Sequence, residues 1–487
     1  MDFRFRTIQG LRWSFINQFI RYGSSIVFAV VLARLLQPQD FGLLAMVRVW
    51  IFFLLSLLKF GLNVLIIQDK SLTKKQISTL YWFQVLLGVA FAYLFYSFAG
   101  KIAELYQKPD IELLAKVLSG LFILSSLTNV NIALIRKKLA FKTEAKISFA
   151  SVVIANIVAV LCALNGYKYW SLAILLVLKQ LIRMVLSYAY VRWIPIFHFN
   201  AIFLWKSLQK GAHITGLRAI NYWSKNLDIF IIGKYAGDEI LGLYSKAYNF
   251  VVNPVRQFTT AVNSAMLPSF SLIQSDIIRI RRVYIEICRA SSIFLLPVIT
   301  IALLFAEDIV KVVLGDKWLP MLNYVYLFGV VALVQFFVRL NNSVFYAIGE
   351  HKVPLKIGVI TKTVTIIAFI TGYLVFEIRG LIIGYILASI IALVPEYWFL
   401  HRKINIQLTD IFQCFYKAAL TITLLITSNW LLVTNLTDLN ATWLYVLRIL
   451  ILTTEMVLSI RLWEPESISH LKSFILPESA NKKSNYE

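Results

Sequence analysis

The sequence predicts an all-α integral membrane protein with about fourteen transmembrane helices. Three observations support this fold class: hydrophobic side chains make up 59% of the 487 residues, charged side chains make up only 15%, and the apolar runs are continuous. Soluble domains are nearer half apolar, and membrane β-strands alternate polar and apolar residues in segments of about ten. Continuous runs of about 20 apolar residues instead match a helix that crosses roughly 30 Å of hydrocarbon.

The expected helices are bounded by charged residues, glycine and proline. The first run contains Arg12 and Arg21 and lacks a cleavage site of small residues, so it predicts a membrane helix rather than a removable signal peptide. The seventh run is the most polar, because polar and charged residues between positions 213 and 228 interrupt it. It should therefore be buried among other helices or line a wet face. The expected ranges are 11–33, 41–61, 78–99, 113–135, 147–165, 168–193, 211–233, 240–264, 287–306, 319–345, 355–376, 379–400, 411–434 and 441–461.

Lysine and arginine concentrate in every second connection between these helices, which the positive-inside rule assigns to the cytoplasm. Both ends of the chain are also basic, so an even number of helices places both termini in the cytoplasm. Two of the basic connections, residues 197–210 and 270–286, mix apolar and basic positions at helical spacing. They predict either helices that lie in the membrane interface or short extensions of the neighbouring membrane helices.

The formal net charge of +23 does not predict nucleic-acid binding, because the basic residues flank apolar helices in short connections. The cysteines Cys162, Cys288 and Cys414 lie far apart without a ligand spacing, so we expect no metal site, no disulfide and no cofactor. The sequence contains no G-x-x-x-x-G-K-[ST] loop for a nucleotide. Energy for transport should therefore come from a gradient or from the substrate.

An internal repeat connects two parts of the chain. Residues 33–43 align with residues 233–243 at a constant offset, sharing a basic residue, a glycine and a leucine, and Ile67-Gln68-Asp69 resembles Ile273-Gln274-Ser275-Asp276. Six expected helices, an even number, separate the copies, so the halves should be parallel lobes around a central cavity, related by an axis along the membrane normal. The predicted division is an N-lobe of six helices (1–207), a C-lobe of six helices (208–400) and two terminal helices with a cytoplasmic tail (401–487).

Basic side chains lie inside several of the apolar runs. A cation near the middle of a membrane costs at least about 2.5 to 3.5 kcal/mol on insertion scales, so it usually faces a protein interior or a wet cavity. Guanidinium forks pair bidentately with phosphate oxygens, and these cations lack matching carboxylates, so they predict an anionic cargo such as a diphosphate or an acidic sugar. The alternative for each is snorkelling to a lipid headgroup or pairing with a neighbour. The predicted cavity residues are Arg21, Arg48, Arg218, Lys225, Lys246, Arg256, Arg339 and Lys362.

One carboxylate lies close to these cations. Asp228 is about one helical turn from Lys225, which predicts an internal ion pair, with coupling to a proton or sodium ion as the alternative. We expect no catalytic residue. The longest outer connection, residues 307–320, contains Glu307, Asp308 and Asp316, which we interpret as ordinary solvated charges.

Several short motifs can be compared with known families. The chain carries Gly10-Leu11-Arg12-Trp13, Val31-Leu32-Ala33-Arg34-Leu35-Leu36 and Asp40-Phe41-Gly42 near its start. Its centre carries Asn226-Leu227-Asp228-Ile229-Phe230-Ile231-Ile232-Gly233, then Leu241-Gly242-Leu243-Tyr244-Ser245-Lys246-Ala247-Tyr248, and later Leu314-Gly315-Asp316-Lys317-Trp318. These motifs, from the first to about the twelfth expected helix, resemble bacterial polysaccharide flippases of the Wzx type, within the multidrug, oligosaccharidyl-lipid and polysaccharide exporter superfamily.

The resemblance implies two six-helix lobes that move undecaprenyl-diphosphate-linked oligosaccharide repeat units from the cytoplasmic to the outer leaflet by alternating access. It implies a role in the biosynthesis of a surface polysaccharide (O-antigen, capsule or exopolysaccharide) and a location in the bacterial cytoplasmic (inner) membrane. The implied partners are the lipid-linked oligosaccharide, membrane lipids, and the polysaccharide polymerase and chain-length machinery. Relatives line the cavity with cations on the first, second, seventh and eighth helices, which here carry Arg21, Arg48, Arg218, Lys225 and Lys246.

Two other functions stay open from the sequence alone. A drug or organic-cation antiporter of the same superfamily would need buried carboxylates to attract its cargo, yet the cores of the first six expected helices contain none. A membrane polymerase or ligase of glycans would need catalytic groups on sizeable outer loops. The outer loops of this chain are short, so we expect a transporter rather than an enzyme.

Overall fold

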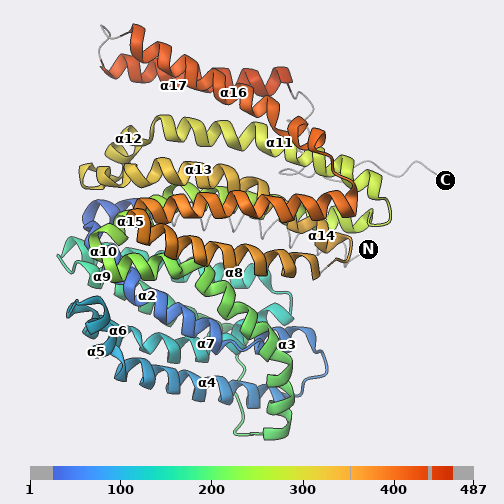
Figure 1. The fold of residues 1–487 in the computed structure, drawn as a ribbon. Coiled ribbons are helices and arrows are strands. Elements are labelled where there is room, and N and C mark those ends of the chain that lie inside the picture. The colour runs from blue at the N-terminus through green and yellow to red at the C-terminus, as the bar shows by residue number, and fades with distance from the viewer. Residues whose placement is uncertain (1–22, 24–25, 351, 437–440, 464–487) are drawn as a thin grey trace. The chain divides into compact units, whose positions relative to one another are not determined.

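The computed structural model describes residue 23 and residues 26–350, 352–436 and 441–463, and all regular structure in those ranges is helical (Figure 1). The chain divides into two compact units. Unit 1 comprises Met1–Ser245 with Val313–Trp318, and unit 2 comprises Lys246–Val312 with Leu319–Glu487. The predicted lobe boundaries, 1–207, 208–400 and 401–487, stay predictions.

Unit 1 contains a helix over Ile26–Leu35 and a series of longer helices. They are α2 (Pro38–Leu58), α3 (Leu62–Gln68), α4 (Lys74–Ser97), α5 (Ala99–Tyr106), α6 (Asp110–Leu118), α7 (Gly120–Lys137), α8 (Phe141–Leu164), α9 (Tyr169–Val191) and the first part of α10 (Ala201–Leu272). Helix α2 starts sharply because Pro38 needs no N–H partner at the first position and Asp40 accepts a hydrogen bond from Gln37 N at 2.8 Å. Thr73 and Gln76 form the equivalent capping box at the start of α4.

Unit 2 contains the rest of α10 and the later helices. They are α11 (Ile277–Leu304), α12 (Ala306–Ile309), η1 (Val310–Leu314), η2 (Asp316–Met321), α13 (Leu322–Arg339), α14 (Asn342–Ala347), α15 (Lys352–Ile404), α16 (Leu408–Asn435) and α17 (Ala441–Trp463), with residues 313–318 assigned to unit 1. Helix α15 breaks at Phe376 and Glu377, whose backbone angles are not helical. Its two parts approach closely through small residues: a Cβ on Gly380 would lie 2.1 Å from the carbonyl oxygen of Gly372.

The all-α membrane fold is confirmed, and the count of fourteen helices stays a prediction. Over the described ranges, ten helices are long and apolar enough to cross a membrane, and α15 contains two of the expected ones, 355–376 and 379–400. Helix α10 contains 211–233 and 240–264, which meet at Gly237, where φ is 87° and ψ is −179°. Glycine reaches these angles without steric cost, so it marks the break. Most of the first expected helix, 11–33, lies outside the described residues.

The two basic connections with helical spacing are joined to membrane helices. Residues 192–200 are not helical, and α10 begins at Ala201, so the second half of the segment 197–210 forms the first turns of α10. Likewise, α11 begins at Ile277 after Asp276, whose carboxylate accepts a hydrogen bond from Arg279 N at 2.9 Å. The helical part of each segment is therefore continuous with a longer helix, α10 or α11, as in the second interpretation.

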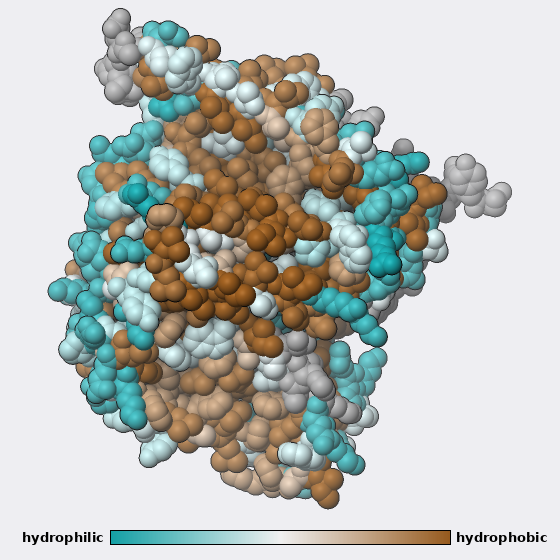
Figure 2. All heavy atoms as spheres, in the orientation of Figure 1, coloured by the Kyte–Doolittle hydropathy of each residue, from teal (hydrophilic) through white to brown (hydrophobic). Residues whose placement is uncertain are grey.

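The surface of unit 2 separates apolar from polar residues along its helices. Over α13 and α15, hydrophobic side chains gather along the middle of the helices and hydrophilic side chains gather at their ends (Figure 2). Outward-facing residues such as Ile367 and Leu387 are more than half exposed. A surface of this kind is stable in hydrocarbon and not in water, as expected for membrane helices.

The two copies of the repeat predicted from the sequence contact each other inside unit 1. A Cβ on Gly42 would lie 1.7 Å from the carbonyl oxygen of Asp238, and a Cβ on Gly242 would lie 1.9 Å from the carbonyl oxygen of Pro38. At the offset of the repeat, Pro38 is equivalent to Asp238, and Gly42 is equivalent to Gly242. The contact is therefore reciprocal, as in a two-fold interface where residue i of each copy meets residue j of the other.

A buried aromatic side chain lies against each copy of the repeat. The indole N–H of Trp318 donates to the carbonyl oxygen of Ala33 at 2.9 Å, and its ring lies 5.4 Å from that of Phe41. Tyr106 lies against Gly233, which is the equivalent of Ala33 in the other copy. A Cβ on Gly233 would lie 3.1 Å from the ring of Tyr106. Both aromatic residues are buried, so each closes one side of the contact between the copies.

Alanine at Gly42 or Gly242 should destabilise the protein, because either Cβ collides with backbone and forces α2 away from α10. Overpacking of this kind typically costs about 1–3 kcal/mol or more, so we expect the melting temperature in detergent to fall by about 5 °C or more. The matched control is Gly120→Ala, since a Cβ at Gly120 meets nothing within 4 Å. Melting of Gly42→Ala at the temperature of Gly120→Ala would contradict the proposed role of the contact.

Candidate functional site

Arg48 lies on α2 where this helix packs against the first part of α10 through aromatic side chains. Trp50 meets Trp223 with ring centroids 5.6 Å apart, and the hydroxyl of Tyr222 donates to the carbonyl oxygen of Val49 at 2.6 Å. Such aromatic pairs contribute about 0.5–1.5 kcal/mol beyond the area they bury. These aromatic contacts therefore hold α2 and the first part of α10 together and stabilise the positions of the neighbouring residues.

The side chain of Arg48 is exposed although protein atoms surround it closely. A group on the outer surface would not be crowded, so this combination is typical of a residue that lines an indentation. The guanidinium carbon lies 5.0 Å from the ring centroid of Phe52, a cation–π distance. Over the described ranges, Arg48 forms no ion pair, so its N–H donors are available to an anion.

A second group of cations comes together from four parts of unit 1: Lys59 just after α2, Arg136 on α7, Arg183 on α9 and Arg218 on α10. Burial, followed by repulsion from the three arginines, lowers the pKa of Lys59 below its usual value. The carboxylate of Glu144 lies 2.6 Å from Arg136 and 3.7 Å from Arg183. One carboxylate near four cations leaves a net positive group, which we name the Lys59 cluster.

Asp228 and Lys225 lie about one turn apart on α10 but differ in exposure. Lys225 is exposed, whereas Asp228 is only 5% exposed. The hydroxyl of Tyr244 donates to Asp228 Oδ2 at 2.7 Å, and Oδ1 has no hydrogen-bond partner over the described part of the chain. The partner that the structure gives Asp228 is therefore a tyrosine rather than a cation. Its role in ion coupling stays a prediction.

The remaining predicted cavity residues fall on unit 2 or outside the described residues. Lys246 on α10, Arg339 on α13 and Lys362 on α15 are half-buried, Arg256 on α10 is exposed, and Arg21 lies outside the described residues. Arg339 donates to Gln335 through Nη2 and accepts a hydrogen bond from Asn263 at its carbonyl oxygen. The role of these cations in one cavity stays a prediction.

A buried carboxylate on the second part of α15 is absent from the residues that the sequence singles out. Glu396 is 3% exposed, and its Oε2 has no hydrogen-bond partner among the described residues. Asn341 lies beside it and accepts a hydrogen bond from the hydroxyl of Tyr284 at 2.6 Å. The one signal in the sequence is a lone glutamate within the apolar range 379–400.

These features define a class: a helical membrane protein that has accessible cations on α2 and α10 and two buried carboxylates, Asp228 and Glu396, on its helices. The chain belongs to the family described as "Polysaccharide biosynthesis protein", whose sequence profile matches residues 31–323. This membership confirms the family that the sequence motifs indicate.

Several relatives are similar over much of their length. The "Lipopolysaccharide biosynthesis protein WzxC" of Escherichia coli (strain K12) is 27% identical over 410 residues, which cover 83% of this chain and 82% of the relative. The "Teichuronic acid biosynthesis protein TuaB" of Bacillus subtilis (strain 168) is 26% identical over 60% of this chain and 61% of the relative. The "Succinoglycan biosynthesis transport protein ExoT" of Rhizobium meliloti (strain 1021) is 24% identical over 63% of this chain and 62% of the relative.

Solved membrane transporters share the fold. The lipid II flippase MurJ in an inward closed conformation matches with a TM-score of 0.74 at 15% identity, over 93% of this chain and 99% of MurJ. An inward-facing multidrug resistance transporter of the MATE family and MOP superfamily matches with a TM-score of 0.59, also at 15% identity, over 78% of this chain and 94% of that one. At such low identity these likenesses establish the fold alone.

Replacing Glu396 by its neutral isostere should leave stability almost unchanged, because the charged carboxylate would have no cationic partner there. We expect Glu396→Gln to melt in detergent within about 2 °C of the wild type, and Glu396→Lys to melt at least about 5 °C lower, since a charge buried in the membrane costs several kcal/mol. Glu104→Lys, at an exposed position, is the control for the charge change alone. If Glu396→Gln and Glu396→Lys lowered the melting temperature equally, the result would mean that a cation pairs with this carboxylate.

Proposed function

We propose that the protein is a flippase that moves undecaprenyl-diphosphate-linked oligosaccharide repeat units from the cytoplasmic to the outer leaflet by alternating access. The product would supply the biosynthesis of a surface polysaccharide. Arg48 is the observation that carries this proposal, because it is a crowded but accessible guanidinium on a membrane helix, with no ion pair over the described residues. Such a group suits the phosphate oxygens of a lipid diphosphate.

Other observations support the same substrate class. The Lys59 cluster adds a second accessible group with excess positive charge, and the named relatives are proteins of polysaccharide biosynthesis, one of them a transport protein. We propose that Arg21, Arg48, Arg218, Lys225, Lys246, Arg256, Arg339 and Lys362 bind the diphosphate and acidic sugars along the transport path, and that Asp228 serves ion coupling. The proposal includes residence in the bacterial inner membrane with both termini cytoplasmic, and delivery to a polymerase and its chain-length machinery.

The alternative cargo of an antiporter, an organic cation, needs carboxylates that the cargo can touch. Two carboxylates on the helices of the two units, Asp228 and Glu396, are both at most 5% exposed. A bulky cation cannot reach them without a large rearrangement, whereas it would meet Arg48 directly and be repelled. The charge distribution therefore favours an anionic cargo.

Loss of the gene should make lipid-linked repeat units accumulate on the cytoplasmic face and should abolish the surface polysaccharide. Re-expression of the wild-type gene should restore the polysaccharide, whereas re-expression of Arg48→Ala should yield at least about tenfold less of it. The reason is that a charge-assisted hydrogen bond to the substrate contributes about 1.5–3 kcal/mol. Arg461→Ala, on the terminal helix α17, controls for loss of a membrane arginine and should restore export fully. Normal polysaccharide in the deletion strain would refute the flippase function, and normal export by Arg48→Ala would refute only the assigned site.

Reversing the charge of Lys59 should separate stability from function. Lys59→Glu replaces repulsion from three arginines by attraction, so the melting temperature should rise by about 2 °C or more. Export should fall because the net positive charge that attracts an anion is reduced. Lys59→Gln should give intermediate values of both the melting temperature and export. Quantitative measurement of surface polysaccharide and detergent melting curves test both parts. A variant that is both less stable and less active would show that Lys59 is a structural residue.

A further inference from the structure

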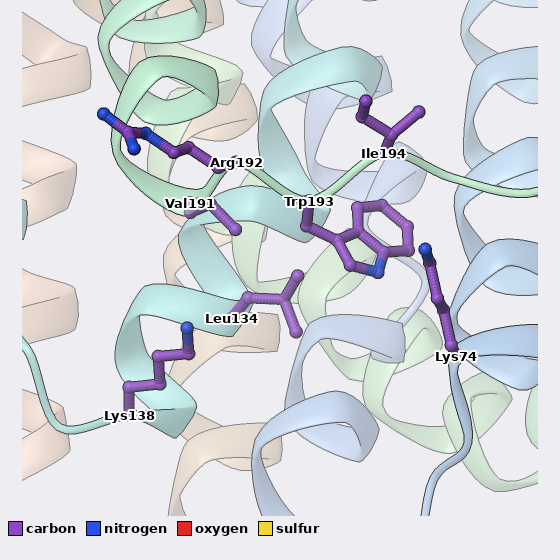
Figure 3. A pocket seen from close by; sticks show the side chains of 7 residues that line it. All are labelled: Lys74, Leu134, Lys138, Val191, Arg192, Trp193 and Ile194. Carbon is purple, nitrogen blue, oxygen red and sulfur yellow. The ribbon is translucent and has the colours of Figure 1, made fainter.

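Unit 1 contains a small basic pocket, and its lining residues are not those of the aromatic contact between α2 and α10. It has a volume of about 350 Å³ and lies where the start of α4, the end of α7 and the end of α9 meet the connection to α10 (Figure 3). Lys74 and Lys138 approach it from opposite sides with Trp193 between them, while the guanidinium of Arg192 is directed away from Trp193. The lining residues are Lys74, Leu134, Lys138, Val191, Arg192, Trp193 and Ile194.

The chemistry of this lining is one-sided. All its charged groups are positive, and the residues between them are apolar or aromatic. No carboxylate, amide or hydroxyl side chain belongs to the lining, so the pocket offers charge to an anion but few hydrogen bonds to the hydroxyls of a sugar. A compact anion joined to an apolar body would match both features.

The connection after α9 forms one wall of the pocket and is held in place by hydrogen bonds with side chains of α4. Ile196 N donates to Ser78 Oγ at 3.1 Å, and Trp82 Nε1 donates to the carbonyl oxygen of Ile196 at 3.0 Å. Asn200 N donates to Thr79 Oγ1 at 3.3 Å, and both hydroxyl residues are fully buried on α4. The connection is therefore pre-organised rather than a loose loop, which lowers the entropy cost of binding.

Large apolar side chains next to the pocket face outward. Ile194 is 75% exposed and Phe197 is 91% exposed, although the Phe197 ring stacks on Trp82 with centroids 4.7 Å apart. Ile202 and Trp205 are exposed on the first turns of α10. Apolar residues of this size beside lysines are typical of a surface that enters the headgroup and acyl boundary of a membrane. The positive-inside rule assigns this end of unit 1 to the cytoplasmic leaflet.

We propose that this pocket binds the phosphate of an anionic glycerophospholipid from the cytoplasmic leaflet, with Lys74 and Lys138 contacting the phosphate and the acyl chains lying along Ile194 and Phe197. Basic pockets between helices on the cytoplasmic side are suited to such headgroups. The bound lipid would connect α4, α7 and the connection to α10, and so would fix the start of α10. This site is separate from the residues assigned to the transported substrate.

The test uses the purified full-length protein in detergent, titrated with phosphatidylglycerol or with zwitterionic phosphatidylcholine, with bound lipid counted by native mass spectrometry. We expect phosphatidylglycerol to be retained preferentially and Lys74→Gln/Lys138→Gln to weaken its retention about tenfold. The matched control is Lys70→Gln/Lys75→Gln, which removes the same charge from exposed lysines at the same end of the unit and should retain the lipid as the wild type does. Melting curves without added lipid verify that both variants are folded.

Three outcomes would overturn the proposal. Equal retention of the two lipids by the wild type would show that the headgroup charge is not recognised. Equal weakening by the two double variants would show a diffuse effect of net charge rather than a pocket. A short isoprenyl diphosphate that displaces phosphatidylglycerol at equimolar concentration, and loses this ability in Lys74→Gln/Lys138→Gln, would assign the pocket to the substrate instead.

Discussion

The reciprocal contact between two glycines and two carbonyl groups constrains the rest of unit 1. Because no Cβ fits at Gly42 or Gly242, the backbones of the two repeat copies touch at two points, and neither helix can rotate without breaking one of them. That constraint fixes which face α2 turns to α10. Arg48 follows Gly42 by six residues, about 9 Å along the helix axis, so the same contact sets the position of its guanidinium.

Much of the fold follows from apolar run length alone, because the membrane demands a helix wherever such a run occurs. The expected range 78–99 and helix α4, Lys74–Ser97, differ mainly where a capping box extends the start. The sequence also reveals the repeat. It also places a boundary between the expected ranges 355–376 and 379–400, where α15 breaks and Glu377 takes a positive φ. It does not reveal that the copies of the repeat touch, because that depends on backbone approach between residues about 200 positions apart.

The site is less readable from the sequence, and the reason is the distance between its members along the chain. Arg48 is visible because it is a lone cation in an apolar run. Lys59 lies near the end of such a run, where snorkelling to a headgroup is the usual interpretation, yet arginines from three other helices lie near it. Arg183 has no motif around it, and Glu396 is one carboxylate whose burial is decided by α11 and the segment around Asn341.

Between residues 218 and 228 of α10, the basic and the acidic side chains differ in exposure, and this division has a functional consequence. Arg218 and Lys225 are accessible to some degree, whereas Asp228, about one turn beyond Lys225, is enclosed and bonded to Tyr244. A transported molecule is selected by the groups that it can touch, so we propose that the cations select it. An enclosed carboxylate can respond only to a proton or small ion, and only when the helix packing opens. Selection of an anionic lipid and coupling to an ion can therefore occupy neighbouring turns of one helix without competing for the same group.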